Sequence, residues 1–399
     1  MKIAIVLFNL ATEAGASRLL FSFAQSLKKQ GNAVVIFTAD YNPNCFPVLS
    51  RGLDIREIKG DIPFSSVFGS KTTFGKILGS LRLYKLAALN ARRIADAMEN
   101  DFDIVNCHTD FSYRVGALYK KRNPKAKFIW TMHDSPFDFN PKKGFIRNIS
   151  SKIFYAVQEK IERRFFKKAD IAVVIDNRNK EIAEKELGLN TRILRGGVDF
   201  ESFYRPVKSK PDSKKIALLS VGSLGRYRRF EDVISATAIL RKKGYDARTL
   251  LVCQDFWADK IYREEFESFI ENSGIKNYID ARFEGVAEKD FMDVYRQSDV
   301  YIYATHIKIW GIAPFEAMSA GLPLVVCSGS SDAEVLKDGE NALFFEPLNP
   351  NQLAEKVEIL MKDSSFYGKI TSNGQRFVKE NVSWDAYARG FIEIALGNK

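Results

Sequence analysis

Short apolar runs alternate with amphipathic helical stretches along this chain, and that alternation limits the folds open to it. Residues 2–8 form an apolar run, residues 17–30 carry apolar side chains at helical spacing, and residues 33–38 form a second apolar run. A strand, a helix and a second strand in this order form a βαβ unit. Further apolar runs follow at 104–107, 128–132 and 171–175. Uninterrupted apolar strands of this kind indicate a parallel sheet covered on both faces.

The same alternation begins again near residue 216. We expect further strands at residues 216–221, 249–253, 300–304 and 324–327, and helices at 230–243 and 384–396. Residues 205–214 contain two prolines and two serines and few apolar side chains, which is typical of a linker. A length of 399 residues also favours two domains over one.

These patterns predict an α/β protein of two Rossmann-like, doubly wound parallel-sheet domains that face a cleft. The N-terminal domain would span residues 1–204, and the C-terminal domain would span residues 215–382. The last helix, within residues 383–399, is expected to pack back toward the N-terminal domain.

The positive charge of the chain is concentrated in two segments of its first half. Residues 69–93 and 139–168 together carry 13 net positive charges, whereas the formal net charge of the whole chain is +11. Apolar and aromatic side chains are interleaved with these cations, which favours a surface that faces anions such as acidic lipid headgroups. A merely solvated basic face remains the alternative. Nothing in the pattern specifically supports a nucleic-acid partner.

Membrane spans, disulfides and metal sites are not expected from this sequence. No apolar stretch approaches the ~20 residues that a spanning helix requires. The four cysteines are scattered and fall largely in apolar runs, so we interpret them as reduced, cytosolic core residues. The three histidines are scattered too, which disfavours a histidine or cysteine metal centre. The carboxylate pair Asp101 and Asp103 precedes its strand, away from the ligand-binding edge, and we interpret it as a turn.

Ligands of open parallel sheets bind outside the carboxyl ends of the strands, so the loops there are the candidate sites. Gly15 lies between the first strand and its helix, where it would let a ligand approach the backbone; an ordinary loop glycine is the alternative. His133 ends the strand at 128–132, and a buried structural histidine is equally compatible with the pattern. Arg226 and Arg228 follow the first strand of the second domain and could bind phosphate. A solvated basic loop would produce the same sequence pattern and is the alternative.

Residues 308–323 read Lys-Ile-Trp-Gly-Ile-Ala-Pro-Phe-Glu-Ala-Met-Ser-Ala-Gly-Leu-Pro and follow the expected strand at 300–304. Pro314 is placed to begin a short helix, with Glu316 in its first turn. A glutamate there can simply complement the helix dipole. That interpretation leaves Gly311 unexplained, because a glycine at this point would let a phosphate reach the backbone amides while Glu316 accepts hydrogen bonds from ribose hydroxyls.

From Trp310 onward this stretch resembles the signature of the retaining glycosyltransferases of family 4, in which a glutamate and a second glutamate are separated by seven residues. Other landmarks occur in family order: residues 14–18 resemble the Gly-Gly-Ala-Glu-Arg loop, residues 131–134 the Thr-x-His-Asp segment and residues 197–199 the Asn-Gly-Val-Asp turn. The resemblance covers nearly the whole chain. It implies the GT-B fold.

The resemblance also implies how the donor's diphosphate would be held. Backbone amides of four residues would bind it, namely those of Gly15, Gly311, Ile312 and Ala313. Arg228 would pair with the same diphosphate. Family members need no metal, since positive groups and helix ends stabilise the leaving diphosphate.

Two further roles follow from the resemblance. Glu316 would bind the ribose, and His133 would contact the donor sugar near the reaction centre. Glu334 matches the glutamate that follows the family's second glycine-rich loop.

The sequence departs from the family at three places. The first glutamate of the signature, which normally holds the donor sugar, is Lys308; the usual arginine is Ser223; and the usual glycine pair before Glu334 is Ser330-Ser331. We expect Arg226 to supply the charge missing at Ser223. The reversed charge at Lys308 predicts either a donor sugar with an acidic group or an activity that is reduced or lost.

These features together predict a cytoplasmic, metal-independent, retaining hexosyltransferase without a cofactor. It would move a sugar from a nucleotide diphosphate sugar, bound by the C-terminal domain, to a glycan or lipid-linked acceptor held by the N-terminal domain. Such a reaction would serve the synthesis of cell-surface polysaccharide or glycolipid, with the basic segments docked on the inner membrane face. The alternative is a catalytically degenerate GT-B protein that binds a nucleotide sugar or partners an active transferase, which Lys308 favours. A nucleotide-sugar 2-epimerase fits the signature loop less well.

Overall fold

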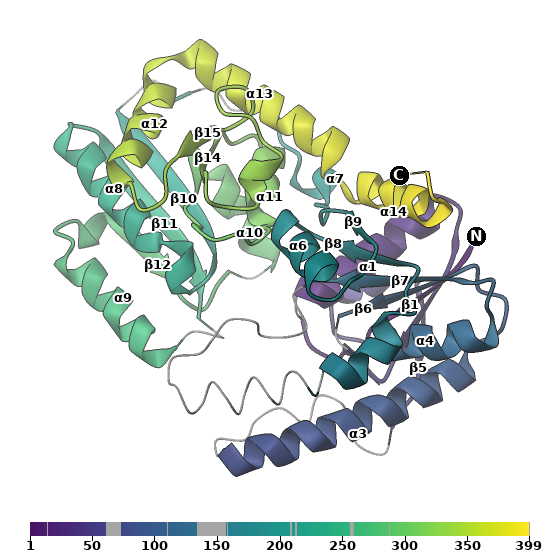
Figure 1. The fold of residues 1–399 in the computed structure, drawn as a ribbon. Coiled ribbons are helices and arrows are strands. Elements are labelled where there is room, and N and C mark those ends of the chain that lie inside the picture. The colour runs from purple at the N-terminus through teal and green to yellow at the C-terminus, as the bar shows by residue number, and fades with distance from the viewer. Residues whose placement is uncertain are drawn as a thin grey trace. The chain divides into compact units, whose positions relative to one another are not determined.

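The structure is a computed structural model that divides into two compact units, Met1–Gly196 with Trp384–Lys399, and Gly197–Ser383 (Figure 1). It describes residues 1–13, 15–60, 73–109, 111–133, 157, 159–207, 210–211, 214–255, 259–286 and 288–398. Most of the basic segment 139–168 and the start of the basic segment 69–93 therefore lie outside the described residues.

The first unit is built on a parallel sheet of seven strands in the order β5-β3-β1-β6-β7-β8-β9. The strands are β1 (Lys2–Val6), β3 (Ala33–Thr38), β5 (Asp54–Glu57), β6 (Ile104–His108), β7 (Lys127–Met132), β8 (Ile171–Val174) and β9 (Thr191–Ile193). A separate two-stranded sheet joins β2 (Asn9–Leu10) to β4 (Asp40–Tyr41). The chain order reverses between β1 and β6, whose register pairs Ile3 with Ile104. That reversal is the topological switch point, outside which ligands of this fold class bind.

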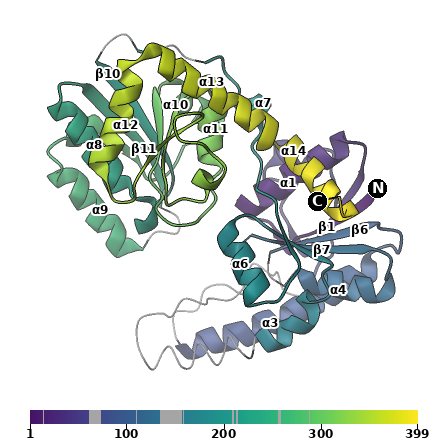
Figure 2. The ribbon, with the colours of Figure 1, turned by 45° about the horizontal axis from the view of Figure 1, so that its top comes forward.

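Alternate residues of β1 face two different cores, because successive side chains of a strand point to opposite faces. Ile3 and Ile5 pack in the core that contains α1 (Gly15–Lys29) and α14 (Trp384–Leu396), and Ala4 and Val6 pack in the core beneath α3 (Thr73–Ala97) and α4 (Tyr113–Arg122) (Figure 2). This unit also has two shorter helices, α2 (Pro47–Ser50) and α6 (Asn177–Lys185), and residues 159–166 are helical as well.

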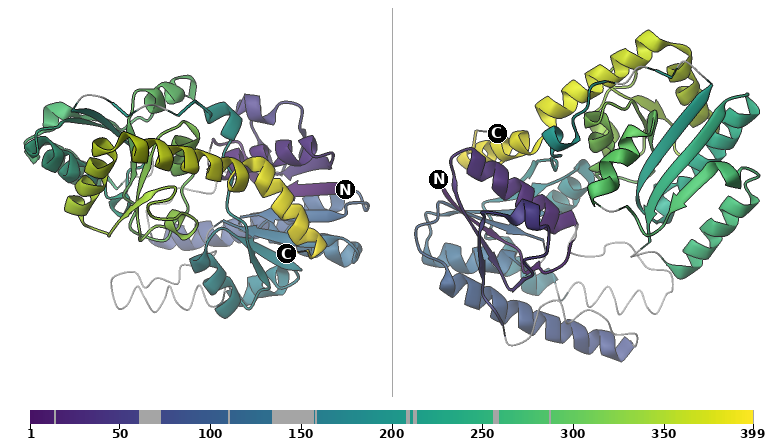
Figure 3. Two further views of the ribbon diagram at one scale, coloured as in Figure 1. Left: turned by 90° about the horizontal axis from the view of Figure 1, so that it is seen from above. Right: turned by 180° about the vertical axis from the view of Figure 1, so that it is seen from behind.

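The C-terminal helix α14 lies against α1 (Figure 3). The rings of Tyr387 and Phe391 contact Phe23 edge-on, at centroid distances of 5.0 and 4.9 Å. Asp385 accepts hydrogen bonds from Ser26 and Lys29 at the other end of the contact. The apolar stripe of α14 is therefore part of the core of the first unit, although it follows the second unit in the chain.

The second unit repeats the plan with a parallel sheet of six strands in the order β12-β11-β10-β13-β14-β15. The strands are β10 (Lys215–Ser223), β11 (Asp246–Gln254), β12 (Ile279–Arg282), β13 (Val300–Tyr303), β14 (Leu324–Cys327) and β15 (Leu343–Phe345). The helices are α7 (Phe200–Phe203), α8 (Phe230–Lys242), α9 (Lys260–Asn272), α10 (Glu288–Arg296), α11 (Ala313–Ser319), α12 (Pro350–Lys362) and α13 (Ser364–Asn381), with single turns η2 (Arg226–Arg228), η3 (Lys276–Tyr278) and η4 (Asp332–Glu334). The chain order reverses between β10 and β13, which is the switch point of this unit.

The division after Gly196 falls eight residues before the predicted domain boundary at 204. Phe200 and Phe203 of α7 are buried in the same apolar cluster as Tyr295 and Met318 of the second unit. The amide of Val198 also donates to the carbonyl of Val382. Residues 197–204 belong with the second unit because its core, and not the first, buries their aromatic rings. Of the predicted linker, residues 208–209 and 212–213 lie outside the described residues.

The predicted fold class is confirmed in both units. Among the described residues, no helix is long and apolar enough to cross a bilayer.

Candidate functional site

Arg228 lies at the switch point of the second unit, where β10 and β13 end. It belongs to the turn η2, five residues after β10 ends at Ser223. Its Nη1 atom donates to the hydroxyl of Tyr303, the last residue of β13, at 2.6 Å and to the hydroxyl of Thr305 at 3.3 Å. The buried Nε atom of Arg228 meets no hydrogen-bond acceptor among the described residues. A guanidinium with donor capacity to spare thus stands at the edge where this fold class binds anions.

Two glycines allow this arrangement by leaving out a side chain. A Cβ added at Gly222 would lie 3.1 Å from Nε of Arg228, and one added at Gly311 would lie 2.5 Å from the hydroxyl oxygen of Tyr303. Real Cβ contacts are essentially never that short, so Gly311 is required by the close approach of Tyr303. The close approach of Tyr303 therefore explains the glycine in residues 308–323, which the start of a helix alone does not require.

The buried carboxylate of Asp332 is tied to the same loop. Both of its oxygens accept from the backbone amide of Gly311, at 3.1 and 3.3 Å. Asp332 is fully buried in the turn η4. Of the three amides predicted to bind diphosphate in this loop, that of Gly311 is therefore occupied by Asp332 in this structure.

Glu316 lies in the first turn of α11, which begins at Ala313, one residue before the predicted start at Pro314. The amides of Ile312 and Ala313 precede the first intrahelical hydrogen bonds, as in any helix N-terminus. The Glu316 side chain is 3% exposed, and its Oε2 atom accepts from the hydroxyl of Tyr295 in α10 at 3.0 Å. A buried carboxylate beside the first amides of a helix can accept hydrogen bonds from a ligand's hydroxyl groups.

Lys308 pairs with Glu334, the two atoms Nζ and Oε1 being 3.6 Å apart. Nζ also donates to the carbonyl of Ser330 at 3.3 Å. The Lys308 side chain is 43% exposed and that of Glu334 is 11% exposed. The cation that replaces the family's first glutamate therefore stands next to another carboxylate of the predicted site.

Arg226 is directed elsewhere. Its guanidinium is exposed, forms an ion pair with Glu265 of α9 and lies over the ring of Tyr262, 4.6 Å from its centroid. The hydroxyl of Ser223 lies 3.2 Å from that of Tyr227. The structure therefore joins Arg226 to α9, whereas Arg228 joins the ends of the two central strands.

His133 follows β7 in the first unit and pairs with a residue that the sequence did not single out. Its Nε2 atom lies 3.1 Å from Nδ1 of His108, the last residue of β6. Burial lowers the pKa of His133 to about 4 and the pKa of His108 well below its usual range. Both rings are therefore neutral at pH 7. The residue after His133, Asp134, lies outside the described residues.

Gly15 begins α1, next to the switch point of the first unit. Nothing lies within 4 Å of a Cβ added there, so packing in this unit leaves open space beside it. Ser17 is the third residue of α1, and its hydroxyl donates to the carbonyl of Thr12 at 2.9 Å.

Tertiary structure thus brings Arg228, Gly311, Glu316, Lys308 and Glu334 into the second unit's loops, and His133 and Gly15 into those of the first. Sequence reasoning missed their partners, which are Tyr303, Thr305, Asp332, Tyr295 and His108. Of these partners, His108 could have been identified from the sequence, because it is a polar residue at the end of an apolar strand. The described residues contain no group of three or more His, Cys, Asp or Glu side chains placed to hold a metal ion.

Two family models match consecutive parts of the sequence. A model described as Glycosyltransferase Family 4 matches residues 14–202, and one described as Glycosyl transferases group 1 matches residues 203–394. The chain belongs to the family 4 glycosyltransferases. The predicted resemblance is therefore confirmed, and with it the GT-B fold and the use of a nucleotide sugar.

Similar proteins support this assignment. This glycosyltransferase is 22% identical over 398 residues to the human alpha-1,3/1,6-mannosyltransferase ALG2, covering 94% of this chain and 90% of that protein. It is 21% identical over 340 residues to the alpha-monoglucosyldiacylglycerol synthase of Acholeplasma laidlawii, covering 79% and 81%. A crystal structure of HepE from Anabaena in complex with UDP and glucose matches with a TM-score of 0.69 and 17% identity over 100% of both chains.

Proposed function

We propose that this family 4 glycosyltransferase transfers a hexose, with retention of the anomeric configuration and without a metal ion, to a glycan or lipid-linked acceptor. The observation that carries the proposal is Arg228, whose guanidinium is held at the switch point with donor capacity to spare. A fixed cation there stabilises the charge that develops on a leaving diphosphate, as a metal ion does in other transferases.

The nucleotide would be bound by the loops around Arg228. The amides of Ile312 and Ala313, at the start of α11, would donate to the diphosphate together with Arg228. The carboxylate of Glu316 would accept from ribose hydroxyls, with Tyr295 fixing its orientation. Gly311 would act through the room it leaves for Tyr303, because its amide is bonded to Asp332. In the first unit, Gly15 would leave space for the diphosphate and His133 would contact the donor sugar.

The ion pair of Lys308 with Glu334 suggests which donor sugars are accepted. An ammonium at the position of the family's first glutamate attracts a carboxylate or phosphate and cannot accept a hydrogen bond from a sugar hydroxyl. A donor sugar with an acidic group is therefore favoured over a neutral hexose.

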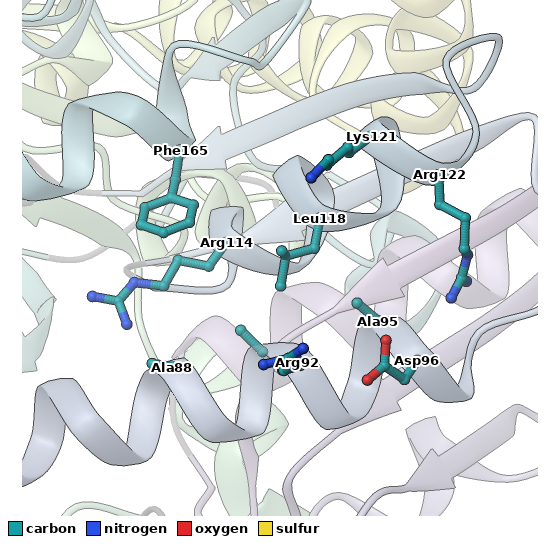
Figure 4. Close-up of a pocket in the computed structure, with 10 residues that line it drawn as sticks. Ala88, Arg92, Ala95, Asp96, Arg114, Leu118, Lys121, Arg122 and Phe165 are labelled. Atoms are coloured by element: carbon teal, nitrogen blue, oxygen red, sulfur yellow. The ribbon is translucent and has the colours of Figure 1, made fainter.

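A basic pocket in the first unit supports an anionic acceptor or membrane surface. A cavity of about 480 Å³ lies between α3 and α4. In Figure 4 Arg92 lies beside Ala88 and Ala95 on α3, and Leu118, Lys121 and Arg122 face them from α4. These three cations are exposed, and Asp96 is the one acidic residue of the pocket's described lining. Arg114, at one end, is already neutralised by the buried Glu162. The synthase relative from Acholeplasma laidlawii, named for a glucosyldiacylglycerol, favours a lipid acceptor.

A thermal-shift panel with UDP-, GDP- and ADP-sugars tests the donor site, because a ligand that binds only the native state raises the melting temperature. One nucleotide is expected to raise it far more than the others, and the matching sugar should then be transferred in the presence of EDTA. Proton NMR of the product's anomeric centre tests retention. A product of inverted configuration, or transfer abolished by EDTA and restored by a divalent metal, would contradict the proposal.

Cosedimentation with vesicles tests the membrane surface. Vesicles rich in anionic lipid should retain the wild-type protein, and the triple variant R92Q/K121Q/R122Q should bind much more weakly, since each cation near the surface contributes about 1 kcal/mol. The variant K276Q/R282Q/R296Q removes the same net charge from the second unit and is the matched control. Equal losses in the two variants would mean that net charge, and not this pocket, attracts the protein.

A catalytically degenerate nucleotide-sugar binder is the second candidate, and Lys308 is the observation that favours it. Saturable binding of a nucleotide sugar without transfer or hydrolysis, to any acceptor of the lipid or glycan class, would support it. Turnover by the isolated protein would exclude it.

A further inference from the structure

The side-chain amide of Asn106 can be oriented without ambiguity. Asn106 lies in β6, and its Nδ2 atom is 3.3 Å from the carbonyl oxygen of Ile129 and 2.8 Å from the hydroxyl of Thr131, both in the neighbouring strand β7. A carbonyl oxygen only accepts, so the group facing it must be the NH₂ of the amide. The carbonyl oxygen Oδ1 of Asn106 is therefore the atom that faces Nε2 of His108, at 2.5 Å.

This orientation fixes the protons on both histidine rings. Since Oδ1 of Asn106 only accepts, Nε2 of His108 must carry a proton and donate it. His108 is fully buried and its pKa lies well below the usual range because of that burial, so the ring is neutral and Nδ1 is bare. Nδ1 must then accept from Nε2 of His133, which is 3.1 Å away. His133 is neutral for the same reason, so its own Nδ1 is the bare nitrogen.

We infer that Asn106 and His108 are positioning residues that hold His133 as the Nε2–H tautomer and present its Nδ1 lone pair to a hydroxyl of the donor sugar. Among the described residues, nothing donates a hydrogen bond to this Nδ1. His133 follows the carboxyl end of β7, one strand from the switch point of the first unit, where ligands of this fold bind. The contact with the sugar rests on the proposed function, whereas the tautomer does not.

Nitrogen-15 NMR of the histidine side chains tests the tautomer directly, because the chain has only three histidines and each signal can be assigned by substitution. Wild-type protein at pH 7 should show His108 and His133 neutral, with protonated Nε2 and bare Nδ1 in both rings. An Nδ1–H tautomer or an imidazolium at His133 would overturn the inference, and this measurement requires no variant beyond those used for assignment.

The hydrogen-bond chain Asn106–His108–His133 is called the relay below. The variant Asn106→Asp should reverse the direction of its hydrogen bonds. A carboxylate facing Nε2 favours the charged form of His108, whose two ring nitrogens would then both donate. Nε2 of His133 would have to accept, and its proton would appear on Nδ1. Thr131→Val is the matched control, because the carbonyl of Ile129 still orients the amide of Asn106 and the tautomer should stay as in wild type.

His108→Phe provides a second route if the aspartate variant does not fold. It removes the acceptor of the His133 proton, so the His133 signals should show a mixture of the two tautomers. A pure Nε2–H tautomer of His133 in both His108→Phe and Asn106→Asp would show that the relay does not set it.

Binding measurements separate the sugar contact from the relay. In Asn106→Asp, affinity for the nucleotide sugar should fall about twofold to tenfold, as for one neutral hydrogen bond, while affinity for the free nucleoside diphosphate stays unchanged. Equal losses for both ligands would overturn the assignment of Nδ1 to a sugar hydroxyl. A wild-type protein that transfers no sugar but shows the expected tautomers would overturn the proposed function and leave the relay standing.

Discussion

The Nη1 atom of Arg228 lies 2.6 Å from the hydroxyl oxygen of Tyr303. The two residues are 75 positions apart in the sequence and meet because β10 and β13 are neighbours at the centre of their sheet. Burial raises the pKa of Tyr303 to about 12, so its hydroxyl stays protonated and does not cancel the positive charge of the guanidinium.

Replacing Arg228 should weaken nucleotide binding. Arg228→Met removes the charge and the donors while keeping an unbranched side chain, and affinity for the nucleoside diphosphate should fall about 10- to 150-fold, since charged hydrogen bonds contribute about 1.5–3 kcal/mol. Calorimetric titration measures the change. The exposed Arg296, at the end of α10, is the control, and Arg296→Gln should bind as wild type does. Unchanged affinity in Arg228→Met would remove Arg228 from the site.

A methyl group added at Gly311 should disturb the contact between Tyr303 and Arg228. Gly311→Ala would place a Cβ 2.5 Å from the Tyr303 hydroxyl, which must move and take its bond to Arg228 with it. We expect a loss of about 1–3 kcal/mol in unfolding free energy, as for other overpacked sites. Urea denaturation provides the measurement. Gly368 is half-buried within α13 and nothing lies within 4 Å of a Cβ added there, so Gly368→Ala should instead stabilise by about 0.5–1 kcal/mol.

The charge at position 308 should set donor preference with little effect on stability. The Lys308–Glu334 pair is partly exposed, so Lys308→Met should cost less than about 1 kcal/mol of stability. For a nucleotide-linked uronic acid, affinity should decrease from wild type to Lys308→Met to Lys308→Glu. For the corresponding neutral hexose the order should reverse. The same order for both donors would show that Lys308 does not face the sugar.

Stability should depend on pH through the paired histidines His108 and His133. Burial lowers the folded-state pKa of His133 from 6.5 to about 4, and that of His108 in the same direction. Below pH 6.5 the unfolded chain therefore binds more protons than the folded one, so stability is fully present above pH 6.5 and decreases as the pH falls toward 4. Urea unfolding at pH 7.5 and pH 5.0 measures this difference. The double variant H108F/H133F should show a smaller difference, and an unchanged one would contradict the assignment.

The sequence predicted the central strands of both sheets and missed the edges. Strands at residues 33–38, 104–107, 128–132 and 324–327 were visible because central parallel strands are buried on both faces and must be apolar throughout. In the two large sheets the missed strands, β5, β9, β12 and β15, are the four edge strands. Three of them carry charged side chains, as in Asp54–Glu57, because an edge strand is partly exposed and tolerates charge.

The sequence alone predicted the kind of site, because loops that bind phosphate through glycines and helix ends need particular residues at fixed spacing along one segment. Residues 308–323 and Arg228 were identifiable on that basis. Only the tertiary structure decided which partner each residue has. It joined Arg228 to Tyr303, the Gly311 amide to Asp332, and His133 to His108, since these contacts are made across neighbouring strands and loops that the linear order does not bring together.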